Sequence, residues 1–267
     1  MSLPVTARNL AGHRRPLVWW VVGLVSYAAM ILAVYPSLRN QPGMAEIAKS
    51  YPKALLALFG MDAASFDLAQ ASTFLNTYLF SAIVPLLYVI FGASRGAAAV
   101  AGQEETGVLD LVLAYPVRRR SYVLQAALAV LVELVVIGFV LWLTVVVGGR
   151  LVGLDVDVAR LSVASLALVL LGGSAAGLAL AVGCATGGKG LADGVAAGVG
   201  VASYLVASLA GIASWLEPAR YASAFWYATD GAMTRGVPLG HLAALVLVDL
   251  VLVAAAVVLF ERRDLAG

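Results

Sequence analysis

The sequence predicts an all-α integral membrane protein with six transmembrane helices. Hydrophobic residues make up 62% of the 267 positions and charged residues only 12%, against roughly 45–50% and about 25% in soluble domains. The chain also contains six apolar runs of about 18 residues or more, which is close to the length that a helix needs to cross a bilayer core of about 30 Å. These runs leave no stretch long enough for a second, water-exposed core, so we expect one transmembrane domain over residues 1–267.

We expect the first span at about residues 17–34. Arg8, Arg14 and Arg15 precede it, as in a signal peptide, but the apolar run is longer than the usual signal core and no small-x-small cleavage pattern follows. The polar connection 36–70 contains an apolar stretch, 54–59, that is compatible with a short interfacial helix.

The second span is expected at about 72–94, with a kink at Pro85. The third and fourth spans are expected at 122–147 and 162–185, the fifth at 191–213 and the sixth at 241–260. The connection 214–240 contains several Trp and Tyr residues, which is typical of a membrane boundary and compatible with an interfacial or re-entrant helix.

A charged segment between the second and third spans has a helical pattern over about 103–115. Val108, Leu111, Val112 and Tyr115 would form one apolar stripe, while the acidic residues Glu104, Glu105 and Asp110 fall in the first two turns. Pro116 would end the helix at about Tyr115. The basic residues Arg118, Arg119 and Arg120 follow. From the pattern alone, this amphipathic helix could be a simple solvated connector.

Six spans place both termini on one side of the membrane. That side would hold most of the 17 basic residues, namely Arg8, Arg14, Arg15, Arg95, Arg118, Arg119, Arg120, Lys189, Arg262 and Arg263. The positive-inside rule therefore predicts that the termini and the amphipathic helix lie on the cytoplasmic side. We expect the protein to be a multi-pass protein of the plasma membrane.

Several other site types find little support. Residues 183–190 fit the pattern Gly-x4-Gly-Lys, but Gly190 stands where a phosphate-binding loop needs Ser or Thr, and the segment lies between two spans. The single cysteine, Cys184, and the two histidines, His13 and His241, have no neighbours at metal-ligand spacing. We therefore expect no metal site, no catalytic constellation and, at a net charge of +2, no nucleic-acid partner.

Small residues predict close helix contacts in the fourth and fifth spans. Gly190, Gly194 and Gly198 recur every four residues at the start of the fifth span, and Gly173 and Gly177 do so in the fourth. The sequence leaves open whether each partner helix lies in this chain or in a second copy.

Two acids, Glu133 and Asp249, lie near the predicted middle of the third and sixth spans. An ionised carboxylate there costs about 2.5 kcal/mol or more, and no lysine or arginine falls within the predicted membrane depth. We therefore expect at least one acid to be protonated at neutral pH. A polar patch or proton-sensitive gate in a transport route and a hydrogen-bonded carboxyl that ties helices together are equally compatible with the sequence.

The charged segment resembles the coupling helix of the permease subunits of prokaryotic type-2 ABC exporters. These have a run of Glu-x-Glu-x-Gly-Thr-Leu-acidic-x-Leu-Leu followed by Pro and Arg. The matching positions here are Gln103, Glu105, Gly107, Val108, Leu109, Asp110, Val112, Leu113, Pro116 and Arg119. Gln103 replaces the first family glutamate and Val108 the threonine. The tail 260–265, Phe-Glu-Arg-Arg-Asp-Leu, is also similar to the end of these permeases.

The resemblance implies a transport subunit that is not itself an enzyme. Two six-span chains, identical or paralogous, would form the route, and two cytoplasmic ATPase subunits would bind the ATP and Mg²⁺, so that this chain binds no cofactor. The coupling residues would be Gln103, Glu104, Glu105, Gly107, Asp110, Pro116, Arg118 and Arg119. The substrate would be a hydrophobic or amphipathic drug, antibiotic or lipid. A proton-coupled secondary transporter that uses Glu133 and Asp249 is the main alternative, and a membrane enzyme acting on lipid is a third.

Overall fold

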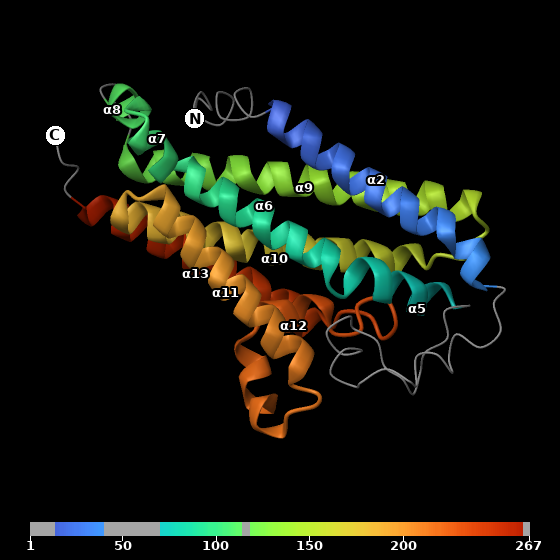
Figure 1. Ribbon diagram of the computed structural model, residues 1–267. Coiled ribbons are helices and arrows are strands. Elements are labelled where there is room, and N and C mark those ends of the chain that lie inside the picture. Colours follow the sequence, from blue (N-terminus) through green and yellow to red (C-terminus); the bar gives the residue numbers. More distant parts are fainter. Residues whose placement is uncertain (1–13, 40–69, 114–117, 264–267) are drawn as a thin grey trace.

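The computed structural model describes residues 14–39, 70–113 and 118–263, and in these ranges the chain forms helices without strands. The helices (Figure 1) are α2 (Arg14–Arg39), α5 (Ala71–Leu75), the π-helical turn η1 (Asn76–Phe80), α6 (Ile83–Ala99), α7 (Ala101–Glu105), α8 (Val108–Leu113), α9 (Arg119–Leu151), α10 (Val158–Thr186), α11 (Lys189–Leu209), the 3₁₀ helix η2 (Ser214–Ala222), α12 (Ala224–Thr229) and α13 (Leu239–Arg262).

Six of the described segments are long and apolar enough to cross a membrane, which confirms the predicted fold class. They are α2, the stretch Ala71–Ala99 that includes α6, and α9, α10, α11 and α13. Most extend beyond the predicted spans, because the helical backbone continues through charged ends that hydropathy leaves out. The fifth is shorter than predicted and ends at Leu209. The apolar stretch 54–59 lies outside the described residues.

The second span is interrupted before Pro85 instead of being kinked at it. The π-helical turn η1 ends at Phe80, and α6 begins at Ile83. Pro85 therefore stands in the first turn of α6, where the missing N–H would have no partner within the helix. The Ser81 hydroxyl donates a hydrogen bond of 2.6 Å to the Thr77 carbonyl at the break.

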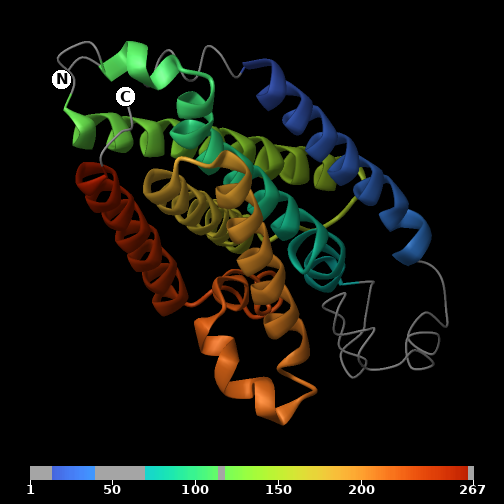
Figure 2. The ribbon, with the colours of Figure 1, turned by 60° about the vertical axis from the view of Figure 1, so that its left-hand side comes forward.

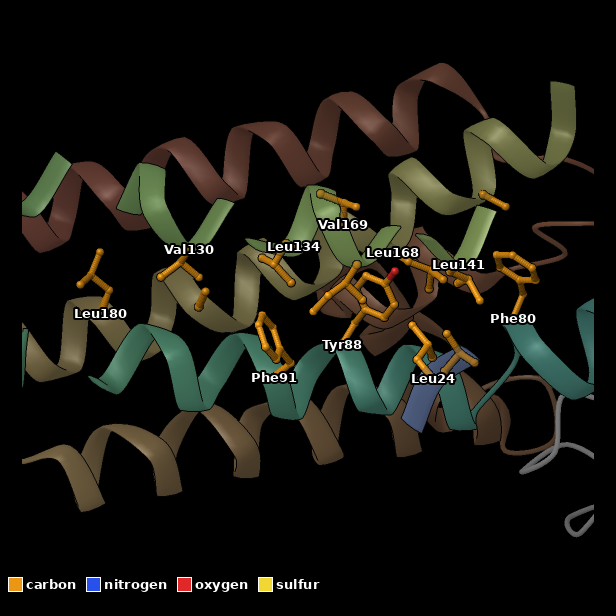
Figure 3. Packing of buried hydrophobic residues seen from close by; sticks show 14 of the residues in the cluster. Leu24, Phe80, Tyr88, Phe91, Val130, Leu134, Leu141, Leu168, Val169 and Leu180 are labelled. Atoms are coloured by element: carbon orange, nitrogen blue, oxygen red, sulfur yellow. The ribbon is translucent and has the colours of Figure 1, made fainter. Parts of the chain in front are cut away.

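Helix α10 is the centre of the bundle. It packs against α6, α9, α11 and α13 (Figures 1 and 2). Its buried face joins that of α6 and α9 in a core that includes Tyr88, Phe91, Leu134 and Leu168 (Figure 3). By contrast, the described part of the chain leaves most of the surface of α2, α11 and α13 uncovered.

Helices α6 and α10 approach so closely that only glycine fits between them. A Cβ atom at Gly92 would lie 2.1 Å from the carbonyl oxygen of Gly172, and one at Gly96 would lie 2.2 Å from that of Ala176. Gly92 and Gly96 are one helical turn apart, which is the small-xxx-small arrangement that brings membrane helices into backbone contact. We call this contact the glycine seam.

The start of α2, the segment α7–α8 and the end of α13 lie at the same end of the bundle (Figures 1 and 2). The opposite end carries the aromatic connection between α11 and α13. There η2 exposes Trp215 and Tyr221, while α12 folds back and buries Phe225 and Ala228 against the bundle. The expected interfacial or re-entrant element is therefore a short helix packed on α10, α11 and α13.

The glycine seam gives a direct test of the packing. Replacing Gly96 by alanine should destabilise the protein by about 1–3 kcal/mol, because the added methyl group meets backbone that cannot rotate away. The free energy of unfolding in a mixed-micelle denaturant titration measures the effect. Gly240→Ala is the matched control, since a Cβ there meets nothing within 4 Å and alanine is the better helix former. Equal stability of the two variants would contradict the seam.

Candidate functional site

The segment between α6 and α9 forms two short helices instead of the single helix expected over 103–115. Helix α7 ends at Glu105, and α8 begins at Val108. Gly107 between them has φ +68°, a left-handed conformation that favours glycine. The Thr106 hydroxyl donates a hydrogen bond of 3.0 Å to the Gly102 carbonyl and so helps to close α7. The apolar periodicity gave no sign of this break.

The apolar side of α8 also differs from the predicted stripe. Leu109 and Val112 are buried, whereas Leu111 has 69% of its surface exposed. All the stripe positions lie after Gly107, so the break does not account for this difference: α8 turns Leu109, and not Leu111, toward the core. Tyr115, Pro116 and the side chain of Asp110 lie outside the described residues.

Glu104 of α7 forms a two-pronged ion pair with Arg263, just beyond the end of α13. The two guanidinium nitrogens donate to its carboxylate oxygens at 2.5 and 3.0 Å. Arg263 also donates to the Cys184 carbonyl in the last turn of α10, at 3.5 Å, and its own carbonyl accepts a 2.7 Å bond from the Arg119 guanidinium. This arginine thus joins α7, α9, α10 and α13.

Glu105 contacts the N-terminus of α11. Its carboxylate accepts a hydrogen bond of 2.7 Å from the backbone N–H of Lys189, at the positive end of the helix dipole, where an anion is stabilised. Sequence reasoning assigned Glu104 and Glu105 to a partner protein, but both have partners within this chain. Gln103 is partly buried in α7, and Arg118 and Arg120 are exposed. Their role in coupling stays a prediction.

Glu133 has a basic partner, so the expectation that no arginine reaches the buried acids is wrong for this residue. Arg95 of α6 donates to both carboxylate oxygens of Glu133 on α9, at 2.6 and 2.8 Å. The side chains are 13% and 1% exposed. The predicted second span ended at residue 94, but α6 continues to Ala99, and the long arginine side chain reaches along the helix into the bundle.

Asp249 of α13 lies against α10. One carboxylate oxygen, Oδ1, is 2.5 Å from the Ser174 hydroxyl oxygen, which is also 3.2 Å from the Leu170 carbonyl. A Cβ at Gly173 would lie 2.6 Å from the other oxygen, Oδ2. Gly173 therefore provides the space that the carboxyl group occupies. Gly177 packs on Leu252 of the same helix, so both fourth-span glycines contact a helix of this chain.

The fifth-span glycines behave differently. A Cβ added at Gly190, Gly194 or Gly198 would meet nothing within 4 Å in the described part of the chain. We call this open side of α11 the glycine face. Of the two arrangements that the sequence left open, contact with another helix of this chain is not observed among the described residues.

The segment 183–190 is the end of one membrane helix and the start of the next. Helix α10 ends at Thr186, Gly187 takes a left-handed conformation and α11 begins at Lys189. A helix thus stands where a phosphate-binding loop has a strand. In the described ranges no three His, Cys, Asp or Glu side chains gather at a common point, and His241 packs against the rings of Trp226 and Tyr227.

The Arg95–Glu133 pair can be tested by a double-mutant cycle. Glu133→Leu alone should destabilise the protein by about 3–5 kcal/mol, because it leaves a buried arginine without its partner. Arg95→Met with Glu133→Leu should recover most of the loss, since an apolar pair of similar volume needs no counter-charge. Thermal unfolding in detergent measures both variants. A double variant as unstable as the single one would show that the ion pair itself does not link α6 to α9.

The comparison with known proteins indicates a membrane transport protein, in keeping with the six membrane-spanning helices. The profile of a family described as ABC-2 family transporter protein matches residues 3–265, nearly the whole chain. A search of curated proteins gives no match. The predicted membership of the ABC-2 permease family is thereby confirmed, and with it a multi-pass transport subunit that is not an enzyme and that works with separate ATPase subunits. The chain belongs to the ABC-2 transporter family and is the membrane-spanning permease subunit of an ABC transporter.

Proposed function

We propose that this permease belongs to an exporter that moves hydrophobic or amphipathic compounds, such as a drug, an antibiotic or a lipid, out of the cell. Two permease chains, identical or paralogous, would form the route. Two cytoplasmic ATPase subunits would supply the energy, and ATP and Mg²⁺ would bind to those subunits and not to this chain.

The contacts of α7 carry this proposal. Helix α7 follows directly on α6, is held to α13 through Glu104 and Arg263, and is held to α11 through Glu105. A force applied by an ATPase at this end of the bundle would therefore reach at least three membrane helices at once, as a rigid-body displacement.

The charges support a cytoplasmic position for this end. Arg118, Arg119 and Arg120 follow α8, and Arg262 and Arg263 end α13, which places five basic residues of this region at the membrane boundary. The positive-inside rule assigns such an end to the cytoplasm. Leu111 of α8 is exposed and offers an apolar contact to the ATPase subunit.

The contacts of Glu133 argue against the alternative hypothesis of a proton-coupled secondary transporter. The carboxylate of Glu133 accepts two hydrogen bonds from a single guanidinium group, which is an arrangement typical of a stable structural pair. The observed contacts therefore do not favour a proton relay that uses both Glu133 and Asp249.

A charge exchange tests how Glu104 acts. If Glu104 works through Arg263, Glu104→Arg should impair assembly with the ATPase subunit and transport-linked ATP hydrolysis, and Glu104→Arg with Arg263→Glu should restore them in part, because opposite charges again face each other. The readouts are co-purification of the ATPase subunit and its hydrolysis rate in nanodiscs. If Glu104 instead contacts the ATPase subunit directly, the exchange brings no recovery. Glu105→Ala is measured alongside, because this variant leaves the contact between Glu104 and Arg263 in place.

Cysteine cross-linking tests whether two permease chains meet at the glycine face of α11. Single cysteines at Gly190, Gly194 and Gly198, and along α2, should form disulfides between copies if those helices meet at the dimer axis. Non-reducing gels of oxidised membranes measure the product. Gly177→Cys is the control, because that position faces Leu252 of the same chain and should give no cross-linked dimer. Products confined to single chains would contradict this interface.

A further inference from the structure

Asp249 differs from the other acids inside the membrane helices. Glu133 is paired with Arg95, and Asp193 with Lys189 at 2.6 Å. No basic side chain lies within 4 Å of Asp249 in the described ranges. An ionised carboxylate at this depth without a counter-charge is costly, and acids in such positions usually mark functional sites.

The surroundings of Asp249 form a built site. The Ser174 side chain is buried, at 6% exposure, and its hydroxyl oxygen lies at hydrogen-bond distance from Oδ1. Gly173 keeps the space beside Oδ2 free. The carboxyl group belongs to α13, and two residues of α10 fix its orientation.

The site can also hold its carboxyl group in either charge state. A serine hydroxyl has one proton to donate. When it donates to Asp249, the acid is the acceptor and can be ionised. When it donates to the Leu170 carbonyl, a protonated Asp249 can donate to the serine oxygen. An empty site can therefore stay neutral, and an occupied one can be charged, without any movement of the helices.

The site is accessible from the side. Asp249 is partly exposed, and its neighbours on α13 form an apolar surface that includes Val246 at 42% and Leu250 at 64% exposure. A compound dissolved in the bilayer can reach the carboxyl group along this surface, whereas a strongly hydrated ion would lose its water shell to do so.

We propose that Asp249, oriented by Ser174 and Gly173, is a recognition site for lipophilic organic cations within the bilayer. The inference rests on the proposed export of hydrophobic or amphipathic compounds and narrows that class to compounds with a positive charge on an apolar body. The apolar part partitions against α13, and the cation supplies the counter-charge that the described chain does not offer.

Binding of radiolabelled tetraphenylphosphonium to the permease–ATPase complex in nanodiscs tests the proposal. We expect saturable binding that Asp249→Asn weakens at least tenfold, because asparagine keeps the shape but has no charge. Asp249→Glu should retain binding within about threefold, since the charge remains. Asp193→Asn is the matched control and should bind like the parent. Tetraphenylborate, which has the same shape and the opposite charge, should not compete.

Each contrary result is informative. Absence of saturable binding to the parent, unchanged binding to Asp249→Asn, or equal competition by tetraphenylborate would each overturn the cation site. If Asp249→Asn does not assemble, Ser174→Ala decides: weakened tetraphenylphosphonium binding in an assembled complex supports the site, because Ser174 orients its carboxyl group, and unchanged binding overturns it. Assembly and basal ATP hydrolysis of the parent are measured in the same samples, so a failure of the proposed function is seen separately.

Discussion

The glycine seam between α6 and α10 is the constraint on which the rest of the bundle depends. Because Gly92 and Gly96 bring α6 into contact with the backbone of α10, helix α10 becomes the common support of the other helices. It uses small residues for further contacts as well: Gly173 and Gly177 face α13, and a Cβ at Gly183 would lie 3.2 Å from that of Ala101 in α7. Without a hydrophobic driving force between helices in lipid, such close backbone packing is a main source of association. One glycine-rich helix therefore contacts α6, α7 and α13 at close range.

Charge pairing adds directional links to this packing. Inside the membrane, Arg95 and Glu133 join α6 to α9 across a buried contact, where neither residue could remain ionised alone without a large cost. At the end of the bundle, Glu104 meets Arg263 and Glu105 meets the start of α11. The segment α7–α8 lies between α6 and α9 in the chain, so the buried pair closes a ring that consists of α6, α7–α8 and α9. The two acids of α7 connect this ring to α11 and α13.

Hydropathy was sufficient to predict the six spans, and the acidic and glycine residues of 103–110 pointed to the family, because both signals are local. The break at Gly107 has a local signal too, since glycine permits the left-handed conformation, but the acidic start and the apolar stripe were combined into one helix over 103–115. The Gly92-x-x-x-Gly96 spacing was also present in the sequence, although nothing in the sequence identified α10 as its partner. The partners of Glu133, Glu104 and Asp249 lie 38, 159 and 75 residues away. Such pairs depend on which helices become neighbours, which no local pattern contains.

The glycine seam and the polar links of α7 differ in how easily their contacts can be replaced by other partners. The glycine seam places backbone against backbone, so α6 and α10 are expected to move together. The links of α7 to α11 and α13 consist of partly exposed polar groups, with Glu104 and Arg263 at 23% and 21% side-chain exposure, where water and salt can replace a partner at low cost. Helices α11 and α13, like α2, also bury little of their surface within the described chain. A conformational change driven from the α7–α8 end is therefore easiest to accommodate at α11 and α13, the helices that carry the open glycine face and Asp249.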